Sequence, residues 1–135
     1  VKKVKDLYIY RFDEGELQLD ISDIKTDCRD IVKNVEYELQ DSNLHIGGYV
    51  YMEGEDSFAQ NVYIQIYDKQ KKQYRYNYTL QMENEQLKDA GKYGGQYSAF
   101  EANVYIDDTE LDNIKVNLIL ENDKSMYRIP INFGG

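Results

Sequence analysis

Apolar side chains occupy both faces of the stretch "NVYIQIYD", residues 61–68. Successive side chains of a β-strand point to opposite sides of a sheet. Tyr63 and Tyr67 share one side, and the aliphatic residues share the other: Val62, Ile64 and Ile66. A strand that is apolar on both sides is typical of the middle of a sheet, so we expect this strand to be central.

The same period-two alternation continues along most of the chain. It occurs over residues 15–21, 34–40, 43–53, 74–80, 98–106, 113–121 and 125–133, and residues 6–12 are apolar enough to form a further strand. This pattern predicts an all-β fold, namely an antiparallel β-sandwich of immunoglobulin-like architecture with about eight strands and minimal helix. Pro130 indicates an edge or terminal strand, since proline cannot donate a hydrogen bond to a sheet.

Three segments interrupt the alternation and predict short helical turns. One turn is expected over residues 84–90, ended by Gly91, and another over residues 107–112. A third, over residues 22–32, would be capped by Ser22 or Asp23.

The length of 135 residues predicts one domain. We assign residues 35–135 to the β-sandwich and residues 1–34 to an N-terminal strand or linker segment that could belong to it. The sequence begins with Val rather than Met, so we expect it to be an excised part of a longer protein.

The net charge of −9 disfavours several classes of partner. An acidic domain repels phosphate backbones and anionic lipid surfaces, so we expect neither nucleic acid nor a membrane surface as a partner. No apolar run approaches the roughly 20 residues of a membrane helix, which argues against direct membrane insertion. The single cysteine, Cys28, excludes an intrachain disulfide.

The sequence carries no recognised catalytic motif, and we expect no enzyme activity and no cofactor. His45 is the only histidine, lacks any zinc-ligand spacing and is expected to face solvent. Cys28 has no evident base beside it. Acidic residues at 107–110 leave a weak calcium alternative at Asp107, Asp108 and Glu110, but no spaced calcium loop is present. We therefore expect solvated turn charges and no metal site.

Tyrosine is the most unusual feature of the composition, with 14 residues and no tryptophan. Tyr74, Tyr76 and Tyr78 alternate with polar residues and share their register with Leu80. This pattern predicts a mainly structural, inward face whose opposite side, with Arg75, Asn77 and Thr79, suits solvent. The alternative is an aromatic platform on which a sugar or a base stacks.

A second set of tyrosines lies opposite the aliphatic residues of two strands: Tyr49, Tyr51, Tyr63 and Tyr67. If these two strands pair, the four phenols form one exposed patch. Tyrosine-rich patches mark interaction surfaces, so we predict that this patch is one. The alternative is packing beneath a linker or against Tyr8 and Tyr10.

Two long stretches, "LHIGGYVYMEGEDSFAQNVYIQIYD" and "FEANVYIDDTELDNIKVNLILENDKSMYRIPI", carry a family resemblance. They resemble the accessory β-sandwich domains of Gram-positive cell-wall glycopolymer glycosyltransferases, the teichoic-acid type of synthase. The likeness covers roughly residues 35–133. The positions that carry it are Ile46-Gly47, Ile64–Asp68, Phe100–Ile106, Leu111 and Tyr127–Pro130. Such modules often have Trp where this chain has Ile114.

The resemblance implies a non-catalytic accessory module of a bacterial cell-envelope polysaccharide-synthesis protein. It also implies a cytoplasmic location, with membrane association through the rest of the protein. Its partner would be a neighbouring catalytic domain or a second copy of itself. The alternative function is an extracellular, adhesin-like or carbohydrate-binding sandwich on the bacterial cell surface.

Overall fold

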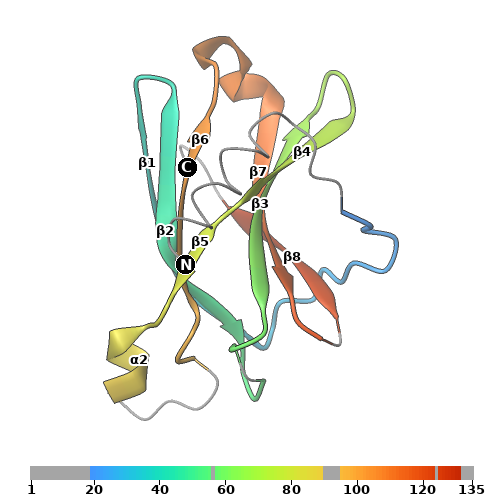
Figure 1. Cartoon of the computed structure of the whole chain (residues 1–135). Helices are drawn as coiled ribbons and strands as arrows, with labels where there is room; N and C mark the ends of the chain where they lie inside the picture. The colour runs from blue at the N-terminus through green and yellow to red at the C-terminus, as the bar shows by residue number, and fades with distance from the viewer. Residues whose placement is uncertain (1–18, 56, 90–94, 124, 132–135) are drawn as a thin grey trace.

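The chain forms an all-β fold of two four-stranded antiparallel sheets in a computed structural model (Figure 1). The structure describes residues 19–55, 57–89, 95–123 and 125–131. Eight strands lie within these ranges: β1 (Ile31–Gln40), β2 (Asn43–Met52), β3 (Asn61–Asp68), β4 (Gln73–Tyr78), β5 (Leu80–Met82), β6 (Ala99–Tyr105), β7 (Ile114–Glu121) and β8 (Met126–Ile131).

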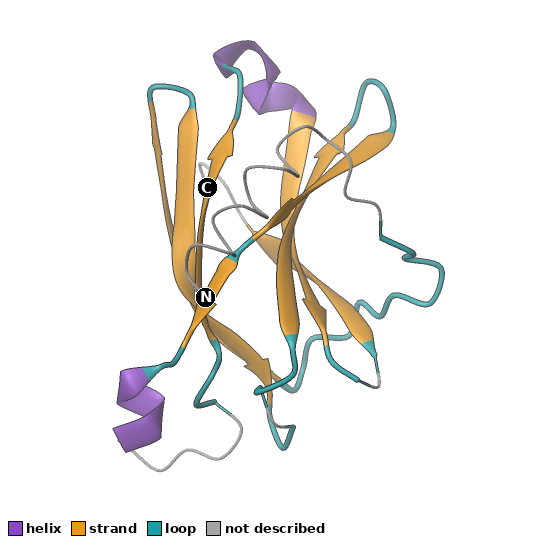
Figure 2. Ribbon diagram, in the orientation of Figure 1, coloured by secondary structure: helices purple, strands orange, loops and turns teal. Residues whose placement is uncertain are grey.

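One sheet has the strand order β1-β2-β6-β5 and the other β4-β3-β7-β8. Strand β3 pairs on one side with β4 and on the other with β7, which confirms that residues 61–68 are a central strand. Short helical elements lie at opposite ends of the sandwich (Figure 2). They are α2 (Glu85–Asp89) and the 3₁₀ turn η1 (Asp108–Asn113), and they confirm two of the three expected helical turns.

The core lies between the two sheets and consists of the aliphatic sides of the alternating strands. Its buried members come from both sheets: Leu44, Ile46, Val50, Val62, Ile64, Ile66, Phe100, Ala102, Val104, Ile106, Ile114, Val116, Leu118, Leu120 and Ile129. Burial of this much aliphatic surface is the main favourable contribution to folding. The alternation therefore identifies the inner faces of β2, β3, β6 and β7 correctly.

A tight turn and a glycine shape the β1–β2 hairpin. Asp41 and Ser42 both have positive φ angles, 53° and 64°, as a two-residue type I′ turn requires. Farther along β2, Gly48 has φ 134°, and a Cβ atom there would clash with the carbonyl oxygen of Asn34 in β1. Only glycine fits this position, so the close approach of β1 to β2 depends on it.

The expected helix over residues 22–32 is wrong. Ile24 closes a turn by donating its N–H to the carbonyl of Ile21 at 3.2 Å, and Lys25 then forms a parallel bridge with Tyr127 of β8. Strand β1 begins at Ile31, so residues 31–34 of the N-terminal segment belong to the first described strand. Tertiary packing of the apolar residues in this segment overrides the capping signal.

Candidate interaction surface

Five tyrosines lie together on the outer side of the β4-β3-β7-β8 sheet, and we call this surface the tyrosine face. They belong to β3 and β4: Tyr63, Tyr67, Tyr74, Tyr76 and Tyr78. Antiparallel pairing places Tyr63 opposite Tyr78 and Tyr67 opposite Tyr74, with Gln65 opposite Tyr76. Directly opposed side chains lie within contact distance on one side of a sheet. The ring centroids of the pairs are accordingly 5.5 Å and 4.8 Å apart.

The sequence correctly predicts a structural role for Tyr76, which is 6% exposed, but the reason given for it is wrong. Leu80 belongs to β5 in the other sheet, so it shares no face with the β4 tyrosines. The chain changes sheets at Thr79, which is buried and donates its hydroxyl to the carbonyl of Val62 at 2.7 Å. The side of this stretch that carries Arg75, Asn77 and Thr79 was expected to suit solvent. At Thr79, that side instead faces the interior of the sandwich.

The predicted four-tyrosine patch does not form, because β2 and β3 belong to different sheets. Tyr49 and Tyr51 lie on the β1-β2-β6-β5 sheet, far from the tyrosine face. Tyr51 is only 6% exposed, and its ring lies close to Gly95, while Tyr49 is half-buried. Of the predicted residues, the structure brings only Tyr63 and Tyr67 together, and it adds the three tyrosines of β4 to them.

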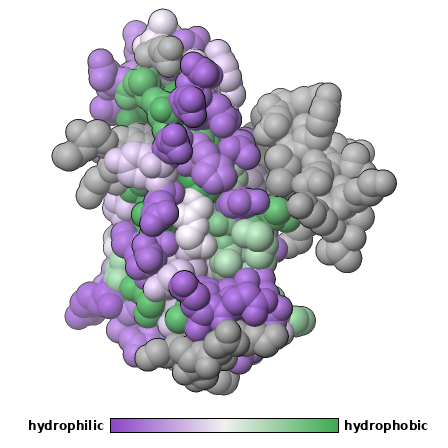
Figure 3. All heavy atoms as spheres, turned by 90° about the vertical axis from the view of Figure 1, so that its left-hand side faces the viewer, coloured by the Kyte–Doolittle hydropathy of each residue, from purple (hydrophilic) through white to green (hydrophobic). Residues whose placement is uncertain are grey.

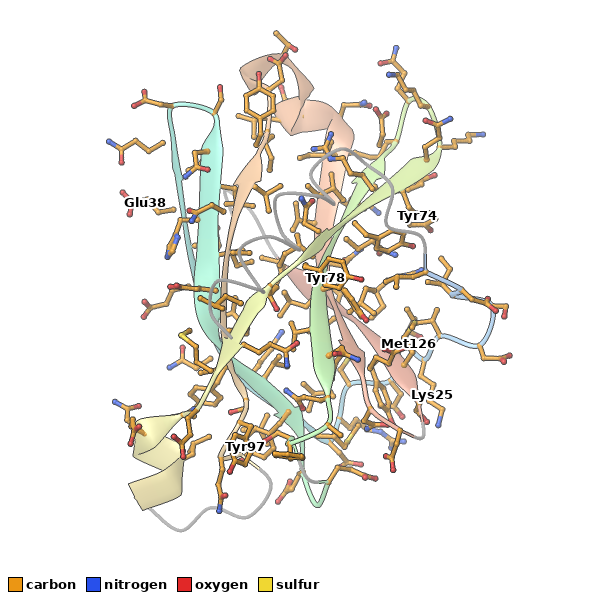
Figure 4. All side chains as sticks on the ribbon, in the orientation of Figure 1. Lys25, Glu38, Tyr74, Tyr78, Tyr97 and Met126 are labelled. Atoms are coloured by element: carbon orange, nitrogen blue, oxygen red, sulfur yellow. The ribbon has the colours of Figure 1, made fainter. Side chains whose placement is uncertain are left out.

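One end of the tyrosine face is covered by the segment that precedes the sandwich, residues 19–26. Its apolar side chains pack with Tyr63, Tyr76 and Ile119 in a second hydrophobic core: Leu19, Ile21 and Ile24, together with Tyr78 and Met126. Two main-chain hydrogen bonds of 2.8 Å fix Lys25 to β8, one to the carbonyl of Met126 and one from the N–H of Arg128. Figure 4 shows Lys25 and Met126 toward one end of this surface and Tyr74 toward the other, with Tyr78 between them.

Hydrogen bonds hold the buried phenols in place. Tyr63 donates its hydroxyl to Glu121 Oε1 at 3.2 Å, and both burial and this carboxylate raise the pKa of Tyr63. Gln65, which is fully buried, donates to the hydroxyl of Tyr76 at 3.2 Å and accepts from Asn117 at 2.9 Å. Burial also raises the pKa of Tyr76. The phenols therefore stay neutral at physiological pH and act as fixed hydrogen-bonding groups.

No segment within the described residues covers the other end of the tyrosine face, which we call its open end. Tyr74 is 43% exposed there, and its ring lies 4.8 Å from that of Tyr67, centroid to centroid. The guanidinium of Arg128 reaches across the sheet from β8 and lies 5.7 Å from the centre of the Tyr74 ring. Lys115 of β7 is exposed and lies opposite Tyr67. This end thus combines aromatic rings with two positive charges, on a chain whose net charge is −9.

A concave surface lies on the outer side of the other sheet, above Gly47. It is a groove of about 370 Å³ with three carboxylates at its sides, Glu36, Glu38 and Glu101. His45 also lines it, is exposed as expected, and has its Nδ1 atom 3.0 Å from Asn103 Oδ1. Within the described residues, no group of three or more acidic, histidine or cysteine side chains could hold a metal ion.

The remaining candidate residues are dispersed. The Cys28 thiol donates to the carbonyl of Arg128 at 3.3 Å, so it lies beside β8, whereas His45 lies on the other sheet. Burial raises the pKa of Cys28, which disfavours the reactive thiolate. Asp107 accepts hydrogen bonds from Thr109, which lower the pKa of Asp107. The side chains of Asp108 and Glu110, the other members of the calcium alternative, lie outside the described residues.

Comparison with known proteins adds no family to this picture. No protein-family model, no curated protein and no solved structure matches the chain. Across the ranges that the structure describes, no helix has both the length and the apolar character needed to span a membrane.

Proposed function

We propose that the chain is a non-catalytic interaction module that binds a protein partner at the open end of its tyrosine face. One observation carries this proposal: the same face already binds a short segment of the chain's own polypeptide. Residues 19–26 lie on it with three apolar side chains in contact with tyrosines and with two main-chain hydrogen bonds to β8. A surface that holds one peptide segment in this way has the chemistry to hold a second.

The open end supplies the features of a protein-binding surface. Tyrosine and arginine are enriched at interfaces, because tyrosine offers apolar area together with a hydrogen-bonding hydroxyl. The Tyr74 ring is fixed by its contacts with Tyr67 and Arg128, so little side-chain freedom is lost on binding. Arg128 and Lys115 favour a partner segment that carries acidic side chains next to apolar ones.

The family resemblance suggests where such a module operates. In an accessory domain of a cell-wall glycopolymer glycosyltransferase, the partner would be the neighbouring catalytic domain of the same polypeptide. The module would then position that domain in the cytoplasm, and the rest of the protein would provide the association with the membrane. This assignment rests on the likeness of the strand patterns and on the open aromatic surface.

Carbohydrate binding at the same place is a second candidate. The partly exposed Tyr74 ring, with Tyr67 beside it, provides an aromatic surface on which a sugar ring can stack. Arg128 could donate hydrogen bonds to sugar hydroxyls or to an anionic substituent. This candidate corresponds to an extracellular module on the bacterial cell surface.

The gene sequence and one titration series separate these candidates. A catalytic domain in the same open reading frame supports the accessory role, whereas a signal peptide and a wall anchor support the surface role. The neighbouring domain and purified wall polysaccharide are each titrated into the module and followed by calorimetry. We expect the domain to bind and Tyr74→Ala to weaken binding by about tenfold or more, which is about 1.4 kcal/mol.

The matched control is Tyr105→Ala, on the other sheet, where the side chain is 68% exposed. Its affinity should equal that of the wild-type module. Binding of the polysaccharide alone would replace the first candidate with the second. Equal effects of the two substitutions would show that the tyrosine face is not the binding surface.

A further inference from the structure

Strand β1 forms one edge of the β1-β2-β6-β5 sheet (Figure 1). All ten of its residues pair with β2 without a bulge, from Ile31 opposite Met52 to Gln40 opposite Asn43. Among the described residues, no strand pairs with its other side. Figure 3 views the molecule from the side on which β1 lies and shows hydrophobic side chains between hydrophilic ones. A long, regular edge of this kind can pair with another strand.

The other sheet edges are less suited to pairing. Strand β5 has three residues and β4 has six. Strand β8 contains Pro130, which has no N–H to donate, and Lys25 already bridges to Tyr127 on it. Strand β1 contains neither proline nor glycine, so it is the longest uninterrupted edge in the described part of the chain.

The hydrogen-bonding direction of β1 follows from its first residues. Glu53 donates its N–H to the carbonyl of Asp30 at 2.8 Å, so this pair, which extends the β1–β2 ladder, is hydrogen-bonded. Hydrogen-bonded and non-hydrogen-bonded pairs alternate along an antiparallel ladder. Even-numbered residues of β1 therefore bond to β2, and the main-chain groups of Lys33, Val35 and Leu39 point away from it.

We propose that two copies of the chain associate by antiparallel pairing of their β1 strands around a two-fold axis beside Val35. This inference concerns a different surface from the tyrosine face and goes beyond the proposed function. Each Val35 would exchange two main-chain hydrogen bonds with the Val35 of the second copy. The two β1-β2-β6-β5 sheets would then form one continuous eight-stranded sheet.

Apolar self-complementarity supports this register. On the inner side of the sheet, Val35 lies opposite its own copy, and Ile31 lies opposite Leu39 of the second copy. Leu39 is 38% exposed, which is unusual for a large apolar side chain on an inner side. Association would cover apolar surface that the single chain leaves partly in water.

The charges of β1 select this register over its neighbours. The residues whose main-chain groups point away from β2 must lie opposite the same kind of residue in the second copy. These are the odd-numbered residues, so the two-fold axis must pass beside a residue and not between two residues. An axis beside Val35 places Glu36 opposite Asn34 and Glu38 opposite Val32.

The neighbouring registers place like charges opposite each other. An axis beside Glu36 would place Glu36 opposite the Glu36 of the second copy, and an axis beside Tyr37 would place Glu36 opposite Glu38. An axis beside Asn34 would oppose Asp30 to Glu38, and like charges directly opposite each other are destabilising.

Net charge sets the expected salt dependence. Each copy carries −9, so two copies repel each other at long range, and the two Glu36 side chains would be diagonal neighbours. Salt screens this repulsion but leaves main-chain hydrogen bonds and apolar contacts in place. Association should therefore strengthen as the salt concentration rises.

Sedimentation velocity over a concentration series tests the association directly. We expect the wild-type chain to dimerise below a concentration of about 1 mM, with a smaller dissociation constant at higher salt. Lys33→Pro removes an N–H that points away from β2, so it spares the β1–β2 ladder and should weaken dimerisation at least about tenfold. Lys33→Thr keeps the N–H and should still dimerise. A wild-type chain that stays monomeric throughout would overturn the proposal.

Disulfide trapping tests the register. In a Cys28→Ser background, Val32→Cys and Glu38→Cys are combined, since these positions would face each other across the two copies. Within one strand, six residues separate them by about 20 Å, which excludes an internal disulfide. We expect the double variant to form a covalent dimer under oxidation and each single variant to remain uncrosslinked. Equal crosslinking by the single variants would contradict the Val35-centred register.

The two proposals can fail separately. Tyr74→Ala should leave the dimerisation constant unchanged, because Tyr74 lies on the other sheet. Lys33→Pro should leave binding at the tyrosine face unchanged for the same reason. A Tyr74→Ala chain that no longer dimerises would place the self-association on the tyrosine face instead of on β1.

Discussion

The side chain of Gln65 on β3 donates a hydrogen bond of 3.2 Å to the hydroxyl of Tyr76 on β4, and both residues are buried on the outer side of their sheet. An outer sheet surface is ordinarily wet. Here the 19–26 segment and the neighbouring side chains turn part of it into a second hydrophobic core, which contains Tyr76.

Replacement of Tyr76 should therefore reduce stability in two separable steps. Tyr76→Phe removes one hydrogen-bonding partner of buried Gln65, which should cost about 1 to 3 kcal/mol. Tyr76→Ala should cost about 2 to 4 kcal/mol, in the range of large-to-small core substitutions. Urea unfolding measures both values. Tyr74→Ala is the control and should cost less than about 1 kcal/mol, since surface substitutions usually have small effects. A larger loss for Tyr74→Ala than for Tyr76→Ala would show that the buried and open ends are reversed.

Gly48→Ala should be among the most destabilising single substitutions in the chain. Its Cβ would clash with the Asn34 carbonyl, so β1 and β2 would have to separate. We expect a loss of more than about 3 kcal/mol, compared with about 1 to 2 kcal/mol for Gly54→Ala. Gly54 also has a positive φ angle, 83°, but nothing lies within 4 Å of its added Cβ. Thermal unfolding of both variants checks the difference, and equal losses would rule out the close approach of β1.

The inner faces of the strands are predictable from the sequence, because a period of two places every second side chain in the core. The aliphatic residues on the inner sides of β2, β3, β6 and β7 are buried, and Ile131 of β8 is partly so. The division of the strands between the two sheets is not predictable from alternation. For that reason, the alternation wrongly groups Tyr49 and Tyr51 with Tyr63 and Tyr67. The sequence also does not show that the chain passes from one sheet to the other at Thr79. Leu80 keeps the two-residue spacing of the β4 tyrosines, so the alternation continues across this point.

The sequence predicts only part of the role of residues 19–26, the segment that covers one end of the tyrosine face. Leu19 and Ile21 belong to an alternating stretch that predicts a strand, yet they contact the tyrosine face without belonging to a named strand. The sequence does not predict the contact between Arg128 and the Tyr74 ring. Arg128 lies opposite Ile119 in the ladder but reaches Tyr74 two strands farther on, a contact that depends on the side-chain conformation.

Alkaline titration should destabilise the domain. The folded-state pKa of Tyr63 lies above its ordinary value because of burial and Glu121. Such a group contributes stability that is fully present below about pH 10 and is lost as the pH rises toward its folded-state pKa. The free energy of unfolding should therefore fall between about pH 10 and about pH 12. Tyr63→Phe should show a smaller fall, and Tyr105→Phe should behave like wild type. Identical pH profiles for Tyr63→Phe and wild type would contradict the assignment.

Loosening the 19–26 segment should expose the tyrosine face. Ile24→Ser removes an apolar contact of the second core and should cost about 1 to 3 kcal/mol. Lys25 is the next residue, and its carbonyl accepts the Arg128 N–H at 2.8 Å, so the exchange of this amide with solvent should accelerate. Hydrogen exchange followed by NMR reads this amide directly, with the Leu118 amide of the central β7 strand as the control. Unchanged exchange at Arg128 would mean that the segment does not depend on Ile24.

Photocrosslinking of the full-length protein in the cells that produce it tests the proposed function most directly. A photoreactive phenylalanine analogue replaces Tyr74 at the open end of the tyrosine face or, as the control, Tyr105 on the other sheet. The two sites are 43% and 68% exposed, so greater exposure alone would favour the control. We expect position 74 to form one defined protein crosslink, to an acidic and apolar segment identified by mass spectrometry, and position 105 to form none. Crosslinks at position 105 alone, or the same crosslinks at both positions, would contradict the claim that the tyrosine face is the interaction surface.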